Sequence, residues 1–219
     1  MKSRLILFLS ALFLASLACQ AAITDSNTPT EAPDLSSNVL FQDDFSNSSS
    51  GWDRVDEAGG LTDYADGVYR MVVNEENSDI WANPGLNFND VHIEVDATKV
   101  GGDDNNDFGL ICRYMDTENF YFMIISSDGY YGIGKVVAGD QQLIGSDSMP
   151  PSNEINQGNA ANHLRADCVG TKLALYVNGE LLAEHEDSQF SSGDVGLMAG
   201  SFDVAGTEIH FDNFVVLQP

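Results

Sequence analysis

Basic residues are scarce in this chain. Its 219 residues include 9 Lys and Arg against 34 Asp and Glu, which gives a formal net charge of −25. Without Lys2 and Arg4, 7 basic side chains face 34 acidic ones, a net charge of −27. Such a field repels phosphates and anionic head groups, so we expect no nucleic-acid partner. Two interpretations of the acidity stay open: solubility, including life in a saline habitat, and divalent-cation binding.

Long apolar runs are absent beyond the first residues. Lys2 and Arg4 precede an apolar run from Leu5 to Leu17, which is short for a membrane span and is typical of a signal peptide. The run ends at Ser16-Leu17-Ala18-Cys19, which resembles the bacterial lipobox. That resemblance implies cleavage before Cys19, diacylation of this cysteine and a lipoprotein of the cell envelope that faces outward. Ordinary secretion is the alternative, because Ser16 and Leu17 depart from the usual lipobox residues.

The chain therefore divides into three parts: a signal peptide (1–18), a lipidated Cys19 with a flexible linker (19–38), and one folded domain (39–219). The linker is rich in small and polar residues and contains Pro29 and Pro33, a composition typical of a hydrated tether. The remaining residues, about 180, are enough for one domain with a sizeable core.

Cysteine is rare as well, with three residues in the whole chain. If Cys19 carries lipid, Cys112 and Cys168 are the pair that remains in an oxidising compartment. Both alternate in phase with apolar neighbours, so both are expected to point inward. We predict a disulfide between them; two buried free thiols are the alternative.

No long segment shows helical periodicity, whereas short alternating segments recur between turn signals. The clearest is a strand–turn–strand–turn–strand pattern from Asn162 to Glu186, in which Asn178-Gly179 is suited to a type I′ hairpin. Further strands are expected at Val39–Phe41, Tyr69–Val73, Asp79–Ala82, Val91–Val100, Phe108–Tyr114, Phe120–Ser126, Tyr130–Val137, Gln141–Gly145, Val195–Phe202 and Glu208–Leu217. The fold class is all-β.

Several motifs in order resemble one family of folds. They are Asp43-Asp44-Phe45 with Gly51-Trp52, Gly109 to Tyr114, Asn119 to Phe122, Asp128 to Tyr131, Tyr176 to Glu180, and Phe211 to Phe214. Together they resemble concanavalin A-like lectin/glucanase sandwiches, and within them the LamG-like and 3-keto-disaccharide hydrolase-like domains of bacterial lipoproteins. The resemblance implies a jelly roll of two antiparallel sheets. It does not fix a function, because such domains include sugar binders, glycosidases and domains without known activity.

Catalytic motifs are missing. Glu94-Val95-Asp96 resembles the start of the catalytic strand of family 16 glycoside hydrolases, but the second Glu of that motif is absent after Asp96. Glu94 and Asp96 are therefore interpreted as outward residues that alternate with buried neighbours. The four histidines show no metal-ligand spacing, and no catalytic triad or phosphate-binding loop is recognisable. An enzyme is thus less favoured than a binding module.

Aromatic side chains are the better lead for a ligand site. If Cys112 is buried, Arg113 should lie on an outer sheet face, where Tyr121, Tyr131 and Lys135 could complete a patch for glycan. Trp81 beside the Asn83-Pro84-Gly85 turn is a candidate at the rim, whereas Trp52 is expected in the core. The alternative is that these aromatic rings only fill the core.

Structural Ca²⁺ is a further possibility, because hard cations prefer carboxylate oxygens. Two candidate sites are the acidic loop with Asp103, Asp104 and Asp107, and the pair Asp44 and Asp212 on the first and last strands. The favoured hypothesis is a lipid-anchored, non-catalytic module that binds glycan or another surface ligand. A glycoside or 3-keto-disaccharide hydrolase and a structural or protein-interaction domain are the alternatives.

Overall fold

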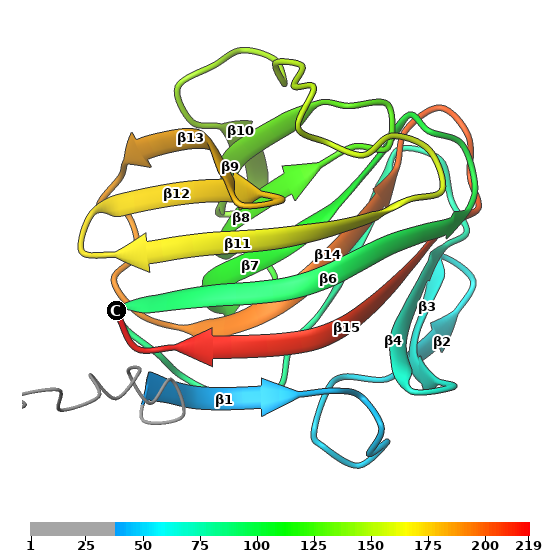
Figure 1. The fold of residues 1–219 in the computed structure, drawn as a ribbon, viewed down its shortest axis with the longest axis horizontal. Helices are drawn as coiled ribbons and strands as arrows, with labels where there is room; N and C mark the ends of the chain where they lie inside the picture. The colour runs from blue at the N-terminus through cyan, green and yellow to red at the C-terminus, as the bar shows by residue number, and fades with distance from the viewer. Residues whose placement is uncertain (1–37) are drawn as a thin grey trace, which may run out of the picture. The chain divides into compact units, whose positions relative to one another are not determined.

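The computed structural model describes residues 38–219, and in them it is an all-β sandwich of two antiparallel sheets (Figure 1). Within this range no helix is long and apolar enough to cross a membrane. The signal peptide, Cys19 and all of the linker but residue 38 lie outside the described residues. The fold class expected from the sequence is confirmed.

One sheet has nine strands, and β15 (Thr207–Leu217) lies in its middle beside β6 (Val91–Gly101). The other edge of β15 pairs with β4 (Val68–Val73) along its first half and with β1 (Val39–Asp43) along its second half. The sheet continues from β6 through β11 (Ala161–Val169), β12 (Lys172–Val177) and β13 (Glu180–Glu186), and from β4 through β3 (Gly60–Ala65) and β2 (Val55–Glu57).

The other sheet has six strands. Its order is β10 (Asp140–Leu143), β9 (Tyr131–Val137), β8 (Asn119–Ile125), β7 (Asn106–Asp116), β14 (Asp194–Ser201) and β5 (Ser78–Ala82). In Figure 1 this sheet lies behind β11, β6 and β15 of the nine-stranded sheet. The main core fills the space between the two sheets, because every second side chain of the facing strands is apolar and buried.

The strand pattern from Asn162 to Glu186 is confirmed as β11, β12 and β13. Asn178 and Gly179 both have positive φ, 52° and 91°, as the tight hairpin requires. No strands were expected at β2 and β3. All three residues of β2 are exposed, so this strand lacks the alternation of buried and exposed residues that predicts a strand.

Trp52 is buried in the main core, as expected, with 3% of its surface exposed. Its ring packs edge-to-face on Phe214, and its Nε1–H donates a hydrogen bond of 3.0 Å to the Asp43 carboxylate. This bond satisfies the polar atom of the indole at the end of the core, where β1 meets β15.

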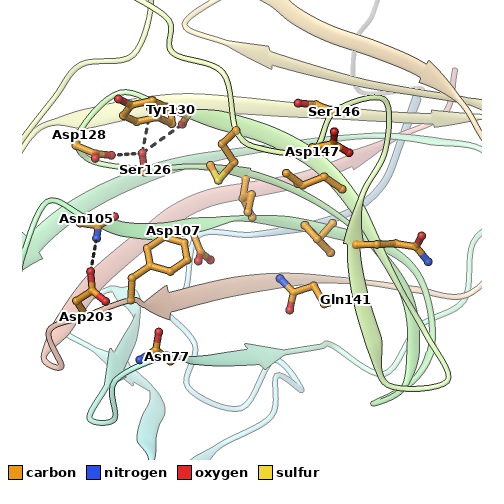
Figure 2. A pocket seen from close by; sticks show the side chains of 16 residues that line it. Asn77, Asn105, Asp107, Ser126, Asp128, Tyr130, Gln141, Ser146, Asp147 and Asp203 are labelled. Carbon is orange, nitrogen blue, oxygen red and sulfur yellow. Dashed lines mark hydrogen bonds between the residues drawn. The ribbon is translucent and has the colours of Figure 1, made fainter.

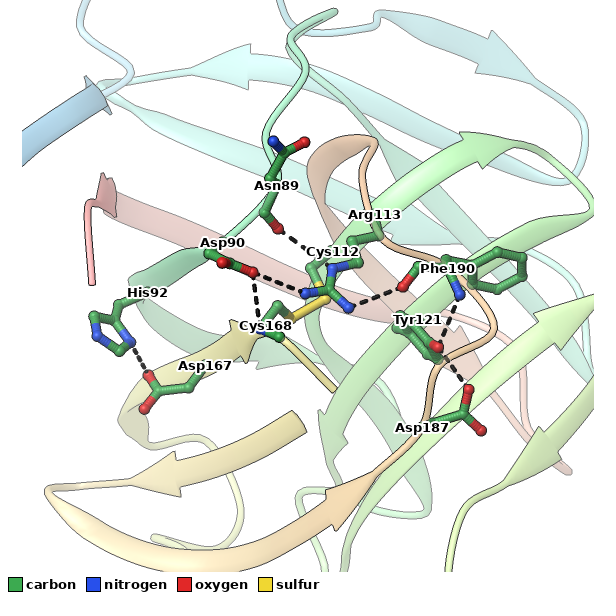
Figure 3. The surroundings of a disulfide bond; sticks show 11 residues. Asn89, Asp90, His92, Cys112, Arg113, Tyr121, Asp167, Cys168, Asp187 and Phe190 are labelled. Carbon is green, nitrogen blue, oxygen red and sulfur yellow. Dashed lines mark hydrogen bonds and ion pairs between the residues drawn. A yellow bond between two sulfur atoms is a disulfide. The ribbon is translucent and has the colours of Figure 1, made fainter. Parts of the chain in front are cut away.

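The predicted disulfide is confirmed: Cys112 on β7 is bonded to Cys168 on β11 (Figure 3). The two strands belong to different sheets, so the bond crosses the core and joins the two layers. Both cysteines are fully buried, as their apolar phase indicated.

Replacing both cysteines by alanine should lower the free energy of unfolding by about 4 kcal/mol, because the crosslink restricts an unfolded loop whose ends are 56 residues apart. Urea denaturation of the double variant and of oxidised wild type measures the difference. Wild type kept reduced serves as the control and should show a similar loss. Quantitative alkylation of both thiols in denatured, unreduced protein would contradict the crosslink.

Candidate functional site

The six-stranded sheet is apolar on both faces. Along β8, Tyr121, Met123 and Ile125 belong to the main core, whereas the alternate residues Phe120, Phe122 and Ile124 point to the opposite face. There they form a second buried cluster with side chains of the neighbouring strands, namely Ile111, Val136 and Met198. This outer face is turned away from the nine-stranded sheet.

A groove of about 980 Å³ lies over this outer face (Figure 2). Phe122 and Ile124 form an apolar floor. Five segments supply the walls: the β4–β5 loop, the start of β7, the β8–β9 turn, β10 with its following loop, and the β14–β15 turn. The wall residues are mostly polar: Asn77, Asn105, Asp107, Ser126, Asp128, Tyr130, Gln141, Gln142, Ser146, Asp147 and Asp203. Phe202 is the third aromatic residue of the lining, with Phe122 and Tyr130.

Glycines allow β8, β9 and β10 to pack closely at one side of the groove. A Cβ on Gly134 of β9 would stand 2.1 Å from the ring of Phe122 and 2.8 Å from the carbonyl oxygen of Gln142 on β10. Any side chain at Gly134 would therefore displace Phe122 or separate β10 from β9. Because Gln141, Gln142 and Leu143 are all in β10, this packing sets the position of one wall.

The turn between β8 and β9 presents the most exposed aromatic ring of the groove. Tyr130 is 40% exposed. Its backbone amide donates a hydrogen bond of 2.9 Å to the Ser126 hydroxyl, and that hydroxyl also binds the carboxylate of Asp128. Just before β7, the side-chain amide of Asn105 contacts Asp203 at 3.4 Å (Figure 2). The rim thus has an aromatic face and several hydrogen-bonding groups.

Two aspartates lie side by side on the outer face of the six-stranded sheet, Asp107 in the lining of the groove and Asp79 in that of the smaller neighbouring pocket. Asp79 on β5 and Asp107 on β7 are both in register with Gly200 of β14, which runs between them. Burial raises the pKa of Asp107 well above its ordinary value, and the neighbouring charge of Asp79 raises it further. Burial also raises the pKa of Asp79, against a lowering effect of hydrogen bonding by Gln141.

The patch predicted from Tyr121, Tyr131 and Lys135 is not on an outer face. Tyr121 is directly opposite Cys112 on β7 and opposite Lys135 on β9, and residues opposite one another share a face. That face is the inner one, because Cys112 is in the core. Tyr121 is 0% exposed and its hydroxyl donates to Asp187 at 2.6 Å (Figure 3). Lys135 pairs with the same carboxylate. Tyr131 packs against the main core.

The outward phase predicted for Arg113 is also wrong, since this side chain is 2% exposed. A bulge interrupts β7 after Cys112, and Arg113 takes a positive φ of 52°, so the alternation no longer holds. The guanidinium donates to the carbonyls of Phe190 at 2.8 Å and Asn89 at 3.3 Å, and to the Asp90 carboxylate at 3.2 Å (Figure 3). These bonds tie together loops at one end of the sandwich.

Trp81 lies on the outer face of the six-stranded sheet, as a ligand role would need, but it is half-buried. Its ring packs on Phe120, with 5.4 Å between the centroids, and its Nε1 contacts the Tyr114 hydroxyl at 3.4 Å. Trp81 does not line the main groove and borders a smaller pocket with Asp79 instead. The tryptophan extends the second apolar cluster.

The acidic side chains proposed for Ca²⁺ do not converge. Asp103 accepts from the amide of Asn105, Asp104 pairs with Lys99, and Asp107 faces Gly200. Asp44 accepts from Ser46, and Asp212 from the amide of Asn213. Among residues 38–219 no three His, Cys, Asp or Glu side chains are grouped to hold a metal ion.

Glu94 and Asp96 lie on the outer face of the nine-stranded sheet and alternate with buried residues, as expected. Both contact His163 of β11, Glu94 at 3.5 Å and Asp96 at 2.8 Å. Neither lines the groove on the six-stranded sheet. The strand that resembles a hydrolase motif is therefore in the other layer of the sandwich.

The fold places the chain in the class of concanavalin A-like jelly-roll sandwiches. The profile of the family described as "3-keto-alpha-glucoside-1,2-lyase-like domain" matches residues 37–217, and the chain belongs to this family. No curated protein matches the sequence.

Solved structures share the fold at low sequence identity. Carbohydrate-binding module CBM66 from Bacillus subtilis is 20% identical and superposes with a TM-score of 0.62, over 77% of this chain and 96% of that one. The Bacillus licheniformis β-glucanase is 12% identical with a TM-score of 0.58, over 82% and 97% of the two chains. The catalytic domain of an endo-1,3-β-glucanase from Thermotoga petrophila is 10% identical with a TM-score of 0.57, over 82% and 97%.

The buried position of Arg113 predicts a structural role. Arg113→Lys should lower the free energy of unfolding by about 2 kcal/mol, because an ammonium group cannot replace the planar fork that bonds two carbonyls and Asp90. Chemical denaturation measures this loss. Arg70→Lys, at a partly exposed ion pair with Glu208, is the matched control and should cost less than ~1 kcal/mol. Equal stability of the two variants would refute the structural role.

Proposed function

We propose that this protein binds glycan in the groove on the outer face of the six-stranded sheet. The observation that carries the proposal is the composition of the groove: two partly exposed aromatic rings, Tyr130 and Phe202, and many amide and carboxylate groups in the same lining. Sugar rings stack on aromatic faces, and their hydroxyls pair with such polar groups. The volume of about 980 Å³ suits a short oligosaccharide.

The comparisons support a sugar ligand. The family description names a lyase of 3-keto-α-glucosides, and one similar structure is a carbohydrate-binding module. The description names a type of domain and not a measured activity of this chain, the module is another protein, and the fold alone also hosts unrelated functions. The weight of the proposal therefore rests on the groove itself.

Binding without cleavage is the form of the proposal that we favour. Glu94 and Asp96, the carboxylates of the hydrolase-like strand, are not in the groove. An oxygen of Asp79 and an oxygen of Asp107 lie 2.1 Å and 2.7 Å from the position that a Cβ on Gly200 would occupy. The two carboxyl groups are therefore closer together than the ~5–5.5 Å at which two carboxyls flank a glycosidic bond in retaining enzymes.

Tyr130→Ala should weaken glycan binding several-fold, because a stacking aromatic ring contributes ~1 kcal/mol beyond the area that it buries. A glycan array identifies the ligand, and calorimetry with the best oligosaccharide measures the affinity. Tyr176→Ala is the control: this ring lies on β12 of the other sheet, beneath Arg165, and its removal should leave affinity unchanged.

Incubation of the same oligosaccharide with wild type should release no new reducing ends and no unsaturated sugar. Turnover that is lost in Asp107→Asn would overturn the non-catalytic form of the proposal and would favour a lyase or hydrolase. Equal affinity of wild type and Tyr130→Ala would instead remove the groove as the binding site.

We further propose that the domain is held at the outer side of the cell envelope by lipid on Cys19. The apolar run before this cysteine and the polar linker after it support this placement. Two acyl chains make attachment stable, whereas one alone binds marginally.

Wild type should accordingly enter the detergent phase of a membrane extraction, and Cys19→Ser should shift it to the aqueous phase, because the acylated thiol is lost. Immunoblots of the two phases measure the partition. Ala18→Ser, which keeps a small residue before the cysteine, is the control and should behave as wild type. Recovery of wild type wholly in the aqueous phase would refute the anchor.

A further inference from the structure

Asp79 and Asp107 meet above a glycine. β5, β14 and β7 are neighbours in the six-stranded sheet, and both aspartates are paired with Gly200 of the middle strand. Residues in register share a face of the sheet. Met198, two positions from Gly200, and Ile111, four positions from Asp107, both belong to the outer cluster, so the two aspartates lie on the outer face. The two carboxyl groups thus approach each other across a strand that has no side chain at this position.

Gly200 leaves the space that the carboxyl groups occupy. A Cβ there would stand 2.1 Å from Oδ1 of Asp79, 2.7 Å from Oδ2 of Asp107 and 2.8 Å from Oδ1 of Asp107. The oxygens of both side chains therefore surround one point. Any other residue at Gly200 would push the two carboxyl groups apart.

The pair lacks a counter-charge. No Lys, Arg or His is among the residues that line the groove, or among those that line the smaller pocket on the other side of Asp79. Asp107 is 2% exposed, and its Oδ1 is a buried atom without a hydrogen-bond partner. Two adjacent carboxylates in a buried site cannot both ionise readily, so burial and proximity favour a proton on one of them.

We propose that Asp79 and Asp107 share one proton and that this pair is a subsite for a neutral, hydroxyl-rich sugar. The shared proton supplies the partner that Oδ1 of Asp107 lacks. When a sugar hydroxyl binds, this proton turns from the partner carboxylate to the hydroxyl oxygen and the ionised carboxylate accepts the hydroxyl proton, so the pair supplies one donor and one acceptor. Uronic acids and sulfated or phosphorylated sugars would meet an uncompensated negative charge.

The charged groups around the pair favour this protonation state. Asp128, Asp147 and Asp203 stand on the walls of the groove, and Glu57 of β2 lies in the pocket that borders Asp79. All are acidic, and Tyr130 is the remaining titratable side chain that lines the groove. The amide of Gln141 from β10 is the neighbour that favours ionisation of Asp79. Their combined field opposes loss of the shared proton.

The proton is tested without any ligand. Carbon-13 NMR of the aspartate carboxyl groups in the full domain should show one group of the pair titrating well above the ordinary aspartate pKa of ~3.9, and Asp107→Asn should remove that titration. Asp79→Asn is the second variant, used if Asp107→Asn does not fold. Titration of both carboxyl groups near or below the ordinary value would overturn the proposal. Binding of Ca²⁺ alone that shifts both carboxyl signals would also overturn it, in favour of a cation site.

The ligand class rests on the proposed glycan function and is tested separately. For the best neutral oligosaccharide, wild-type affinity should fall by up to ~10-fold per pH unit above the upper pKa of the pair, because the deprotonated pair loses its donor. Asp107→Asn carries a permanent donor and should bind with little pH dependence. Asp96→Asn, at a half-exposed acid on the outer face of the nine-stranded sheet, is the matched control and should keep the wild-type profile.

Two outcomes would distinguish failure of the subsite from failure of the proposed glycan function. A shared proton in the NMR titration without binding of any neutral glycan at any pH would overturn the ligand half together with the proposed function. Glycan binding that is independent of pH in wild type, or tighter binding of the matching uronic acid, would overturn the subsite while leaving glycan binding by the groove intact.

Discussion

The structure depends on one constraint: the six-stranded sheet must bury apolar side chains on both faces. Its inner face packs on the nine-stranded sheet, and the disulfide between Cys112 and Cys168 crosses that core. Its outer face has no second sheet and carries the cluster around Phe120 and Phe122. Removing that cluster from water is favourable by roughly 25 cal/mol per Å² of apolar surface, so the loops that cover it are held against the sheet. The groove lies between those loops.

Two glycines allow neighbouring side chains to pack closely on the outer face. Gly134 lets Phe122 and β10 approach β9, and Gly200 lets the carboxyl groups of Asp79 and Asp107 meet. Neither glycine has a positive φ, so backbone freedom does not explain them. Each is required because a Cβ would clash with a neighbouring group. The same glycines thus connect the packing of the sheet to the chemistry of the groove.

Much of the fold could be predicted from alternation alone. The β11–β13 hairpins and the inward phase of both cysteines follow from period-2 patterns and a type I′ dipeptide. The prediction of the ligand patch was wrong for a specific reason: the bulge after Cys112 reverses the phase of Arg113. The outward position predicted for Tyr121 was wrong because this residue pairs with Cys112 across the β7–β8 hairpin, and the sequence of one strand does not reveal that register.

The groove itself combines five separate segments, and of its lining residues only Asp107 was a site candidate in the sequence, as a cation ligand in the acidic loop. The most direct test of glycan binding in the groove is NMR shift mapping of the domain with a neutral oligosaccharide. The perturbed amides should cluster at the β8–β9 turn, β10 and the β14–β15 turn. Perturbations confined to the outer face of the nine-stranded sheet, around Glu94, His163 and Tyr176, would contradict it.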